Sequence, residues 1–119
     1  MKVYEDDRVL AFLDLHPIAE GHTLVIPKAH VPFFLDLHEE DYHAVATVVQ
    51  QLGRKIRAAF NPVRLGLLVK GFDVNHTHYH LIPMQEDADI TSGRYTGVPP
   101  EATAEQREAV AEKIRDAQA

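Results

Sequence analysis

The sequence predicts an α+β fold, in which a five-stranded antiparallel sheet packs with one long central helix and a C-terminal helix. Three observations lead to this prediction: alternating apolar and polar segments fill the first third of the chain, a long stretch with helical periodicity follows, and two more strand-like segments precede a second helical stretch. With 119 residues, 45% of them hydrophobic, the chain has enough apolar side chains for one core. We therefore expect a single domain over residues 1–119, with a core in residues 1–84 and a loop and C-terminal helix in residues 85–119.

The first three predicted strands are "KVYED", "RVLAFLDL" and "HTLVIPK". Turn residues Asp6 and Asp7 separate the first two, which we expect to pair as a hairpin, and the loop "HPIAEG" leads into the third.

A long helix is predicted from Glu39 to Phe60, because apolar residues recur there at steps of three and four. They are Tyr42, Val45, Val49, Leu52, Ile56, Ala59 and Phe60. Asp36 or His38 lies where a cap is expected, and the acidic "EED" suits the N-terminal end of the helix dipole. The "NP" at positions 61 and 62 ends the helix.

After this helix, "VRLGLLVK" and "VNHTHYHLIPM" predict two further strands, separated by a tight turn at Gly71. The segment "QEDADITSGRYTGVPPE" has no period and predicts a loop. "PEATAEQREAVAEKIRDAQA" predicts the C-terminal helix, with Pro100 near its start and Val110 and Ile114 on one side.

Composition excludes several classes of protein. The chain has no cysteine, which rules out disulfides and thiolate metal sites, and no apolar run approaches the roughly 20 residues of a membrane span. Because the N-terminus also shows no leader, we expect a cytoplasmic protein. A net charge of −6 opposes broad nucleic-acid binding, which depends on a basic surface.

Three histidines at alternate positions, His76, His78 and His80, are the main functional signal. On a strand they would share one face. At ~3.3 Å per residue the outer two are about 13 Å apart, which argues against all three binding one zinc ion. A neighbouring pair could still bind a metal with a third ligand such as His22, and the row could also be ordinary polar residues on a solvated strand.

A third hypothesis is nucleophilic catalysis. A neutral imidazole, with a reference pKa of about 6.5, attacks phosphorus well at neutral pH. His78 is the natural attacker, because a histidine on each side could orient it and hold the substrate.

The "HTHYHLI" segment resembles the motif of the histidine triad family, and the upstream "AFLDLHPIAEGHTLVIPKAH" is similar to the segment that precedes the triad there. The resemblance spans about Val3 to Pro83. It implies a small α+β homodimer that binds a nucleotide, expected to be a purine nucleotide, and acts at its α-phosphate through a nucleotidyl-histidine intermediate. We expect no metal or other cofactor, because the absent cysteines and the strand geometry both oppose a dedicated metal site. The implied substrates are nucleoside phosphoesters, phosphoramidates and dinucleoside polyphosphates.

The resemblance also implies roles for individual residues. His78 matches the nucleophile, His76 and His80 its outer partners, and His22 the fourth active-site histidine. Asp14 matches the residue that binds the ribose hydroxyls, and Phe12 and Leu15 match positions that line the base pocket. Structural alternatives remain: Asp14 could simply end a strand, and Phe12 and Leu15 could belong to the core. His30 is expected to position structure, whereas His16, His38 and His43 are expected at the surface.

The chain departs from the family pattern before the triad, where "KGFDVNH" replaces a longer glycine-rich loop and brings in Phe72 and Asp73. An acidic Asp73 would repel a phosphate unless it points away, contacts the sugar, or is neutralised by Lys70 or Arg64. Two rival hypotheses stay open beside the enzyme: a nucleotide-binding regulatory module with little turnover, and a histidine-ligated metal protein.

Overall fold

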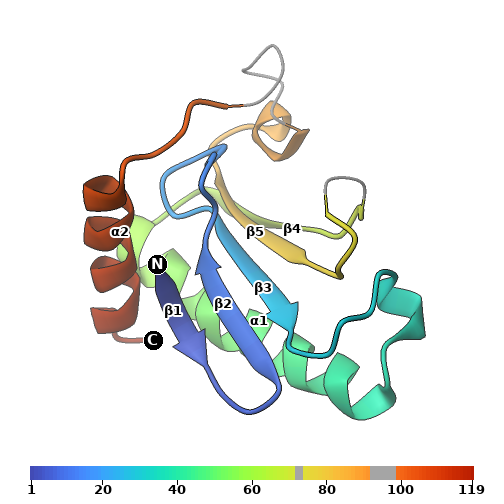
Figure 1. Ribbon diagram of the computed structural model, residues 1–119. Helices are drawn as coiled ribbons and strands as arrows, with labels where there is room; N and C mark the ends of the chain where they lie inside the picture. The colour runs from blue at the N-terminus through green and yellow to red at the C-terminus, as the bar shows by residue number, and fades with distance from the viewer. Residues whose placement is uncertain (72–73, 92–98) are drawn as a thin grey trace.

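The computed structural model describes residues 1–71, 74–91 and 99–119. Its centre is a five-stranded sheet in the order β1-β2-β3-β5-β4, in which all neighbours are antiparallel (Figure 1). The strands are β1 (Lys2–Glu5), β2 (Val9–Leu13), β3 (Thr23–Pro27), β4 (Arg64–Leu68) and β5 (Tyr79–Met84). The predicted α+β class and the hairpin of the first two strands are confirmed.

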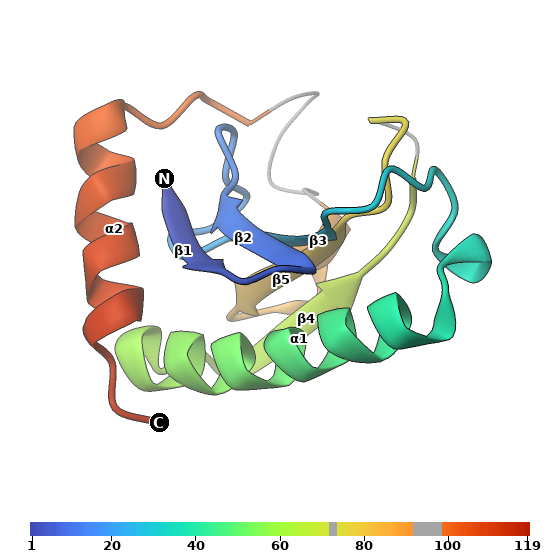
Figure 2. The same ribbon diagram turned by 60° about the horizontal axis from the view of Figure 1, so that its bottom comes forward.

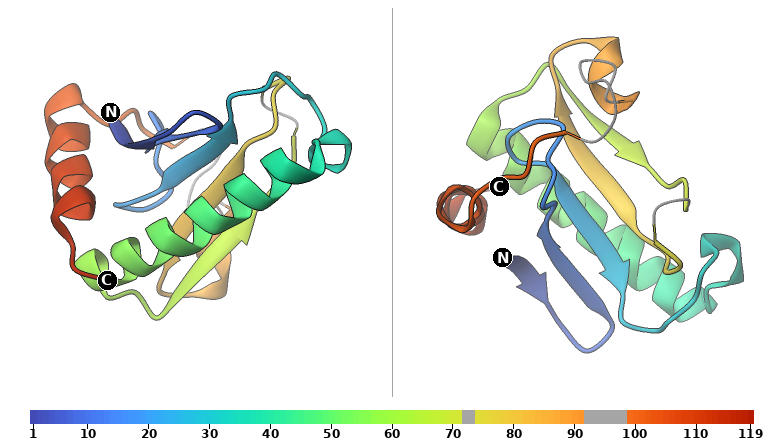
Figure 3. Two further views of the ribbon diagram at one scale, coloured as in Figure 1. Left: turned by 90° about the horizontal axis from the view of Figure 1, so that it is seen from below. Right: turned by 45° about the horizontal axis from the view of Figure 1, so that its top comes forward.

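Two helices cover this sheet on one face and at one side. The long helix α1 (Glu39–Phe60) lies along one face (Figure 2), and α2 (Ala104–Asp116) packs against β1 and the C-terminal part of α1 (Figure 3). In the part of the chain that the structure describes, neither helix is long and apolar enough to cross a membrane.

The bounds of α1 agree with the prediction at both ends. Asn61 ends the helix in the left-handed conformation, with φ of 46°, and its N–H donates to the carbonyl of Arg57. His38 occupies the N-cap position without a side-chain hydrogen bond, whereas Asp36 lies in a short 3-10 helix, η1 (Phe34–Asp36). Of the two candidate caps, His38 has the right position, and its side chain does not cap the helix.

The two faces of the sheet have different surroundings. Alternate residues of β2, β3 and β5 pack against buried side chains of α1 to form the hydrophobic core. The core side chains of these elements are Val9, Ala11, Leu13, Val25, Tyr79, Leu81, Val45, Val48, Leu52 and Ile56. The opposite face carries a row of directly paired residues, Phe12, Leu24 and His80, on three neighbouring strands. The candidate site is therefore built on the face of the sheet that α1 leaves open.

The largest difference between the predicted and observed strands lies at the histidine row. The strand expected over residues 74–84 begins only at Tyr79, because the ladder with β3 ends at the Val25–Tyr79 pair. Just before it, Thr77 donates from its backbone N–H and its hydroxyl to the carbonyl of Val31, beyond the end of β3. Of the three triad histidines, only His80 thus lies in a strand.

The segment after Met84, predicted as loop, contains a 3-10 helix, η2 (Asp87–Thr91). The carboxylate of Asp89 accepts from the backbone N–H groups of Gln85 and Glu86 and stabilises this turn. The C-terminal helix begins at Ala104, four residues after Pro100, behind a capping box of Thr103 and Gln106.

Candidate active site

The loop between β2 and β3, residues 14–22, positions two of the predicted site residues. The N–H of Asp14 donates to the carbonyl of His22, 3.1 Å away, and the N–H of His22 donates to the carbonyl of Ala19, 3.0 Å away. Gly21 closes this turn with φ of 97°, and an added Cβ would lie 3.0 Å from the ring of Phe60. Only glycine fits this position without strain.

His22 is held from both sides of its ring. The backbone N–H of Ile18 donates to His22 Nδ1 at 3.0 Å, and His22 Nε2 lies 2.9 Å from Nδ1 of His80. A backbone N–H can only donate, so His22 Nδ1 carries no proton and the neutral ring is protonated at Nε2. His22 therefore donates to His80, whose own proton then lies on Nε2.

Burial keeps His22 neutral. The side chain is 2% exposed, and burial lowers its pKa from the ordinary 6.5 to about 4. The carboxylate of Asp14, with Oδ2 3.5 Å from His22 Nε2, acts in the opposite direction, while His80 and Lys70 lower the pKa further.

His78 lies beside His80, with ring centroids 5.0 Å apart. Its Nδ1 is 2.7 Å from the carbonyl oxygen of His76. A carbonyl can only accept, so Nδ1 carries a proton and the neutral ring has its lone pair on Nε2.

His76 is fixed at the end of β3. Its Nε2 donates to the carbonyl of Pro27 at 2.8 Å, and its ring meets the ring of His30 edge to face at 5.1 Å. The structure thus brings His22, His80 and His78 into one continuous group, with His76 at its outer end. The contact with His76 is compatible with the positioning role expected for His30.

The other three predicted residues lie beside this group. Asp14 follows β2, and its Oδ1 accepts from the N–H of His16 at 2.8 Å, while Oδ2 faces His22. Phe12 is half-buried on the open face in the row that ends at His80, and Leu15 is 39% exposed in the loop. Neither Phe12 nor Leu15 belongs to the hydrophobic core, which was the structural alternative for both.

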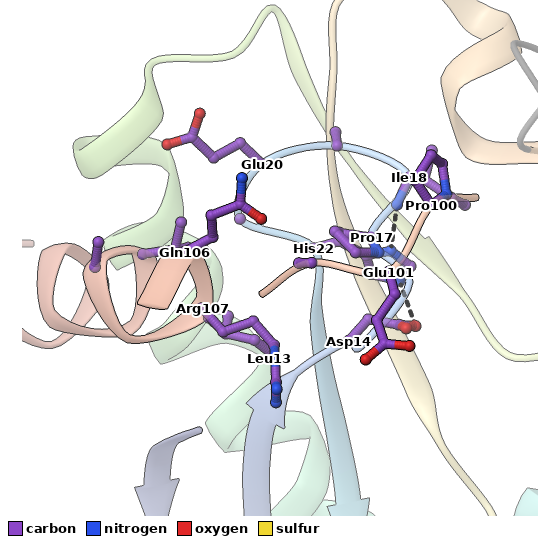
Figure 4. A pocket seen from close by; sticks show the side chains of 15 residues that line it. Leu13, Asp14, Pro17, Ile18, Glu20, His22, Pro100, Glu101, Gln106 and Arg107 are labelled. Carbon is purple, nitrogen blue, oxygen red and sulfur yellow. Dashed lines mark hydrogen bonds and ion pairs between the residues drawn. The ribbon is translucent and has the colours of Figure 1, made fainter. Parts of the chain in front are cut away.

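A pocket of about 560 Å³ opens between the loop at residues 14–22 and α2 (Figure 4). Asp14 and His22 line it from the sheet side, and Gln106 and Arg107 line it from α2. The segment before α2 is tied to the loop, because the N–H of Ala102 donates to the carbonyl of Leu15 at 2.8 Å. The pocket adjoins the histidine group but is not lined by His78, His80 or Phe12.

The same group offers a cluster of possible metal ligands. Within the described ranges, Asp14, His22 and His80 place one ligand atom each within 4.8 Å of one another. A histidine that binds a metal normally donates its other N–H to an acceptor. The second nitrogen of His22 instead faces a donor, the N–H of Ile18, so the observed hydrogen bonds oppose metal binding by His22 Nε2.

Two features of the site were not predicted. The N–H of Ile18 leaves no side-chain signal in the sequence, and the contribution of α2 to a pocket beside Asp14 requires the tertiary fold. Phe72 and Asp73, which the sequence places before the triad, lie outside the described residues.

Comparison with known proteins places this geometry in context. A family model described as the HIT domain matches residues 1–87. The chain is 41% identical to "Protein hit" of Bacillus subtilis over 97 residues, which cover 74% of this chain and 64% of that protein. It is 31% identical to the "Adenosine 5'-monophosphoramidase HNT1" of Saccharomyces cerevisiae over 103 residues, which cover 86% of this chain and 63% of that protein. The chain thus spans less than two thirds of the length of these relatives.

Solved structures with this fold cover nearly the whole chain. A Hit-like protein from Bartonella henselae superposes with a TM-score of 0.82 at 34% identity, covering 98% of this chain and 86% of that one. A zinc-bound histidine triad family protein from Mycobacterium smegmatis superposes with a TM-score of 0.73 at 27% identity, covering 96% of this chain and 80% of that one.

Proposed function

Because the chain belongs to the histidine triad (HIT) family, we propose that it hydrolyses or transfers the nucleotidyl group of a purine nucleotide derivative, with His78 as nucleophile. Phosphoramidates are the first substrates to test, because a yeast relative is named as an adenosine 5'-monophosphoramidase. Nucleoside phosphoesters and dinucleoside polyphosphates follow.

One observation carries the assignment of His78. Its Nδ1 donates to the carbonyl of His76 at 2.7 Å, which leaves a lone pair on Nε2. A nucleophilic imidazole needs this arrangement, because the bond formed at Nε2 places positive charge on the ring and a fixed acceptor at Nδ1 stabilises that charge.

The reaction then proceeds in two displacements. Nε2 of His78 attacks the α-phosphorus, the bond from phosphorus to the leaving nitrogen or oxygen breaks, and the leaving group departs with the bonding electron pair and takes up a proton. Water, or another acceptor, next attacks the same phosphorus, and the phosphorus–nitrogen bond to His78 breaks. The products are the nucleoside monophosphate, or its transfer product, and free His78.

The neighbouring residues support this chemistry by position. In the tautomer that the His22 contact favours, His80 carries a proton on Nε2 and would donate it to a phosphoryl oxygen beside His78. Asp14 accepts from the N–H of His16 with Oδ1, and its Oδ2, 3.5 Å from His22 Nε2, would accept from the ribose hydroxyls. Phe12, half-buried on the open face, and Leu15, 39% exposed in the loop, would offer apolar surface for the base.

The proposal is tested by trapping the intermediate. The protein is mixed with an adenosine phosphoramidate that has a good leaving group, quenched at alkaline pH to protect the acid-labile bond, and mapped by peptide mass. We expect the adduct on His78. The His78→Ala variant should lose both adduct and turnover while it still binds the nucleotide, whereas His43→Ala, on the exposed side of α1, serves as the matched control.

The outcomes separate the rival functions. An adduct on another residue, or full activity in His78→Ala, would sink the assignment. Nucleotide binding without turnover would favour a regulatory module.

We also expect activity to survive dialysis against a chelator, so a loss that zinc restores would favour the metal hypothesis.

A further inference from the structure

We propose that the backbone N–H of Ile18 is a positioning group that fixes the proton order along His22 and His80, so that His80 presents an N–H beside His78. The tautomer order is a property of the folded protein alone. The catalytic benefit rests on the function proposed above.

The Ile18 N–H determines the proton positions along the hydrogen-bonded series Ile18, His22 and His80. The Ile18 N–H is part of the backbone and cannot reverse its direction, whereas each imidazole can be protonated on either nitrogen. Donation to His22 Nδ1 sets His22 Nε2 as the donor to His80 Nδ1, and His80 Nε2 as the protonated atom at the end. Without the amide, both rings could reverse together, and His80 would present a lone pair in place of an N–H.

The same hydrogen bonds oppose the binding of a further proton by the His22–His80 pair. A proton on His80 Nδ1 would require His22 Nε2 to accept, which moves the proton of His22 to Nδ1, directly against the Ile18 N–H. The other charged or titratable groups that act on His22 are Asp14 after β2 and Lys70 after β4. Asp14 favours a proton on His22 and Lys70 disfavours it, so the amide and burial together decide against it.

The proton position on His80 also affects how a phosphoryl group would be held. A negatively charged substrate attracts protons to nearby imidazoles, and a protonated ring that donated from the wrong nitrogen would misplace the phosphoryl group. The Ile18 amide favours the tautomer in which His80 presents an N–H beside His78.

The test uses histidine labelled with nitrogen-15 in the whole ligand-free protein, because ring nitrogen shifts distinguish the two tautomers and the charged form. We expect His22 and His80 both protonated at Nε2 and His22 still neutral at about pH 5. Replacing the Ile18 amide by an ester, through incorporation of the corresponding α-hydroxy acid, removes only the N–H. Ile18→Pro removes it genetically, and Ile18→Val, which retains it, is the matched control.

In the ester protein His22 should gain a population protonated at Nδ1 and titrate at least about one pH unit higher, which is a tenfold change in its protonation equilibrium. The pH at which turnover falls off on the acid side should rise together with the His22 titration. Ile18→Val should change neither the His22 titration nor this pH dependence. A wild-type His22 protonated at Nδ1, or an ester protein with unchanged tautomers and titration, would overturn the inference. Since these spectra need no substrate, tautomers as expected in a protein that forms no His78 adduct would contradict the proposed function alone.

Discussion

At the scale of single residues, fixed backbone groups hold the histidines of the candidate site. His22, His76 and His78 each exchange a hydrogen bond with a backbone atom, of Ile18, Pro27 and His76 respectively. Backbone N–H groups only donate and carbonyl oxygens only accept, so these contacts fix which ring nitrogen carries the proton in the neutral form of each ring. The proton positions on these histidines therefore depend on the main chain as well as on the histidine side chains.

The ionisation of His22 makes the stability of the fold depend on pH. Its pKa is about 4 in the folded protein, against an ordinary value of 6.5, so only the unfolded chain takes up a proton between these values. The contribution of this neutral histidine is fully present above about pH 6.5 and is lost as the pH falls toward 4. We expect the free energy of unfolding in urea to fall by about 2 kcal/mol from this residue between about pH 7.5 and pH 5.

The variant His22→Asn should lack this component of the pH dependence, because asparagine does not titrate. His43→Asn, on the exposed surface of α1, should retain it. Equal pH slopes for the wild type and His22→Asn would show that His22 is protonated in the folded state.

Asp14 provides a prediction about substrate recognition. Asp14→Asn replaces an acceptor-only carboxylate by an amide, and hydrogen bonds to charged groups contribute roughly 1.5–3 kcal/mol. We expect binding of a ribonucleotide, measured by calorimetry, to weaken about 10- to 100-fold. A 2',3'-dideoxynucleotide should bind the wild type and the variant with similar affinity. A wild-type protein that bound both nucleotides equally well would show that Asp14 does not recognise the ribose.

At the scale of secondary structure, the sequence predicted those elements whose stability is local. The apolar period and the Asn61-Pro62 stop define α1, and its predicted bounds match the structure at both ends. The strand after Gly71 was predicted five residues too long, because its start depends on where its partner β3 ends. Alternation along the chain gives no information about the length of the neighbouring strand.

The same distinction applies to the site. The motif and its resemblance to a family predicted which side chains to expect in one site, and the structure brings His22, His78 and His80 together. The amide of Ile18 and the α2 residues of the pocket could not be predicted, because neither a backbone direction nor a contact between residues 14–22 and α2 has a sequence pattern.

The capping box of α2 is a local interaction with a measurable contribution. The Thr103 side chain accepts from the N–H of Gln106 at 3.0 Å, and the Gln106 side chain accepts from the N–H of Thr103 at 2.8 Å. We expect Thr103→Ala to lower the free energy of unfolding by about 1 kcal/mol, and Thr103→Ser to preserve it. Urea unfolding followed by circular dichroism measures both, and an unchanged stability in Thr103→Ala would indicate that α2 begins elsewhere in solution.

At the scale of the whole molecule, the sheet has two edges with different surroundings. The edge strand β1 packs against α2, whereas the other edge strand, β4, carries the apolar side chain of Leu67, 51% exposed, and is preceded by Val63, 60% exposed. A second apolar surface lies near the start of α1, where Phe33 is 66% and Leu35 82% exposed. Apolar side chains on an open strand edge favour pairing with another chain.

We therefore predict a homodimer, as the resemblance to the histidine triad family also implied, and place its interface at the β4 edge. Light scattering coupled to size exclusion at micromolar concentration should give twice the chain mass of 13.4 kDa. Leu67→Lys places a charge on the strand edge, where its burial would be costly, and should shift the mass to that of one chain. Leu35→Lys introduces the same charge on the other apolar surface and should leave the dimer intact. A monomeric wild type would refute the dimer, whereas dissociation by Leu35→Lys but not Leu67→Lys would place the interface at the start of α1.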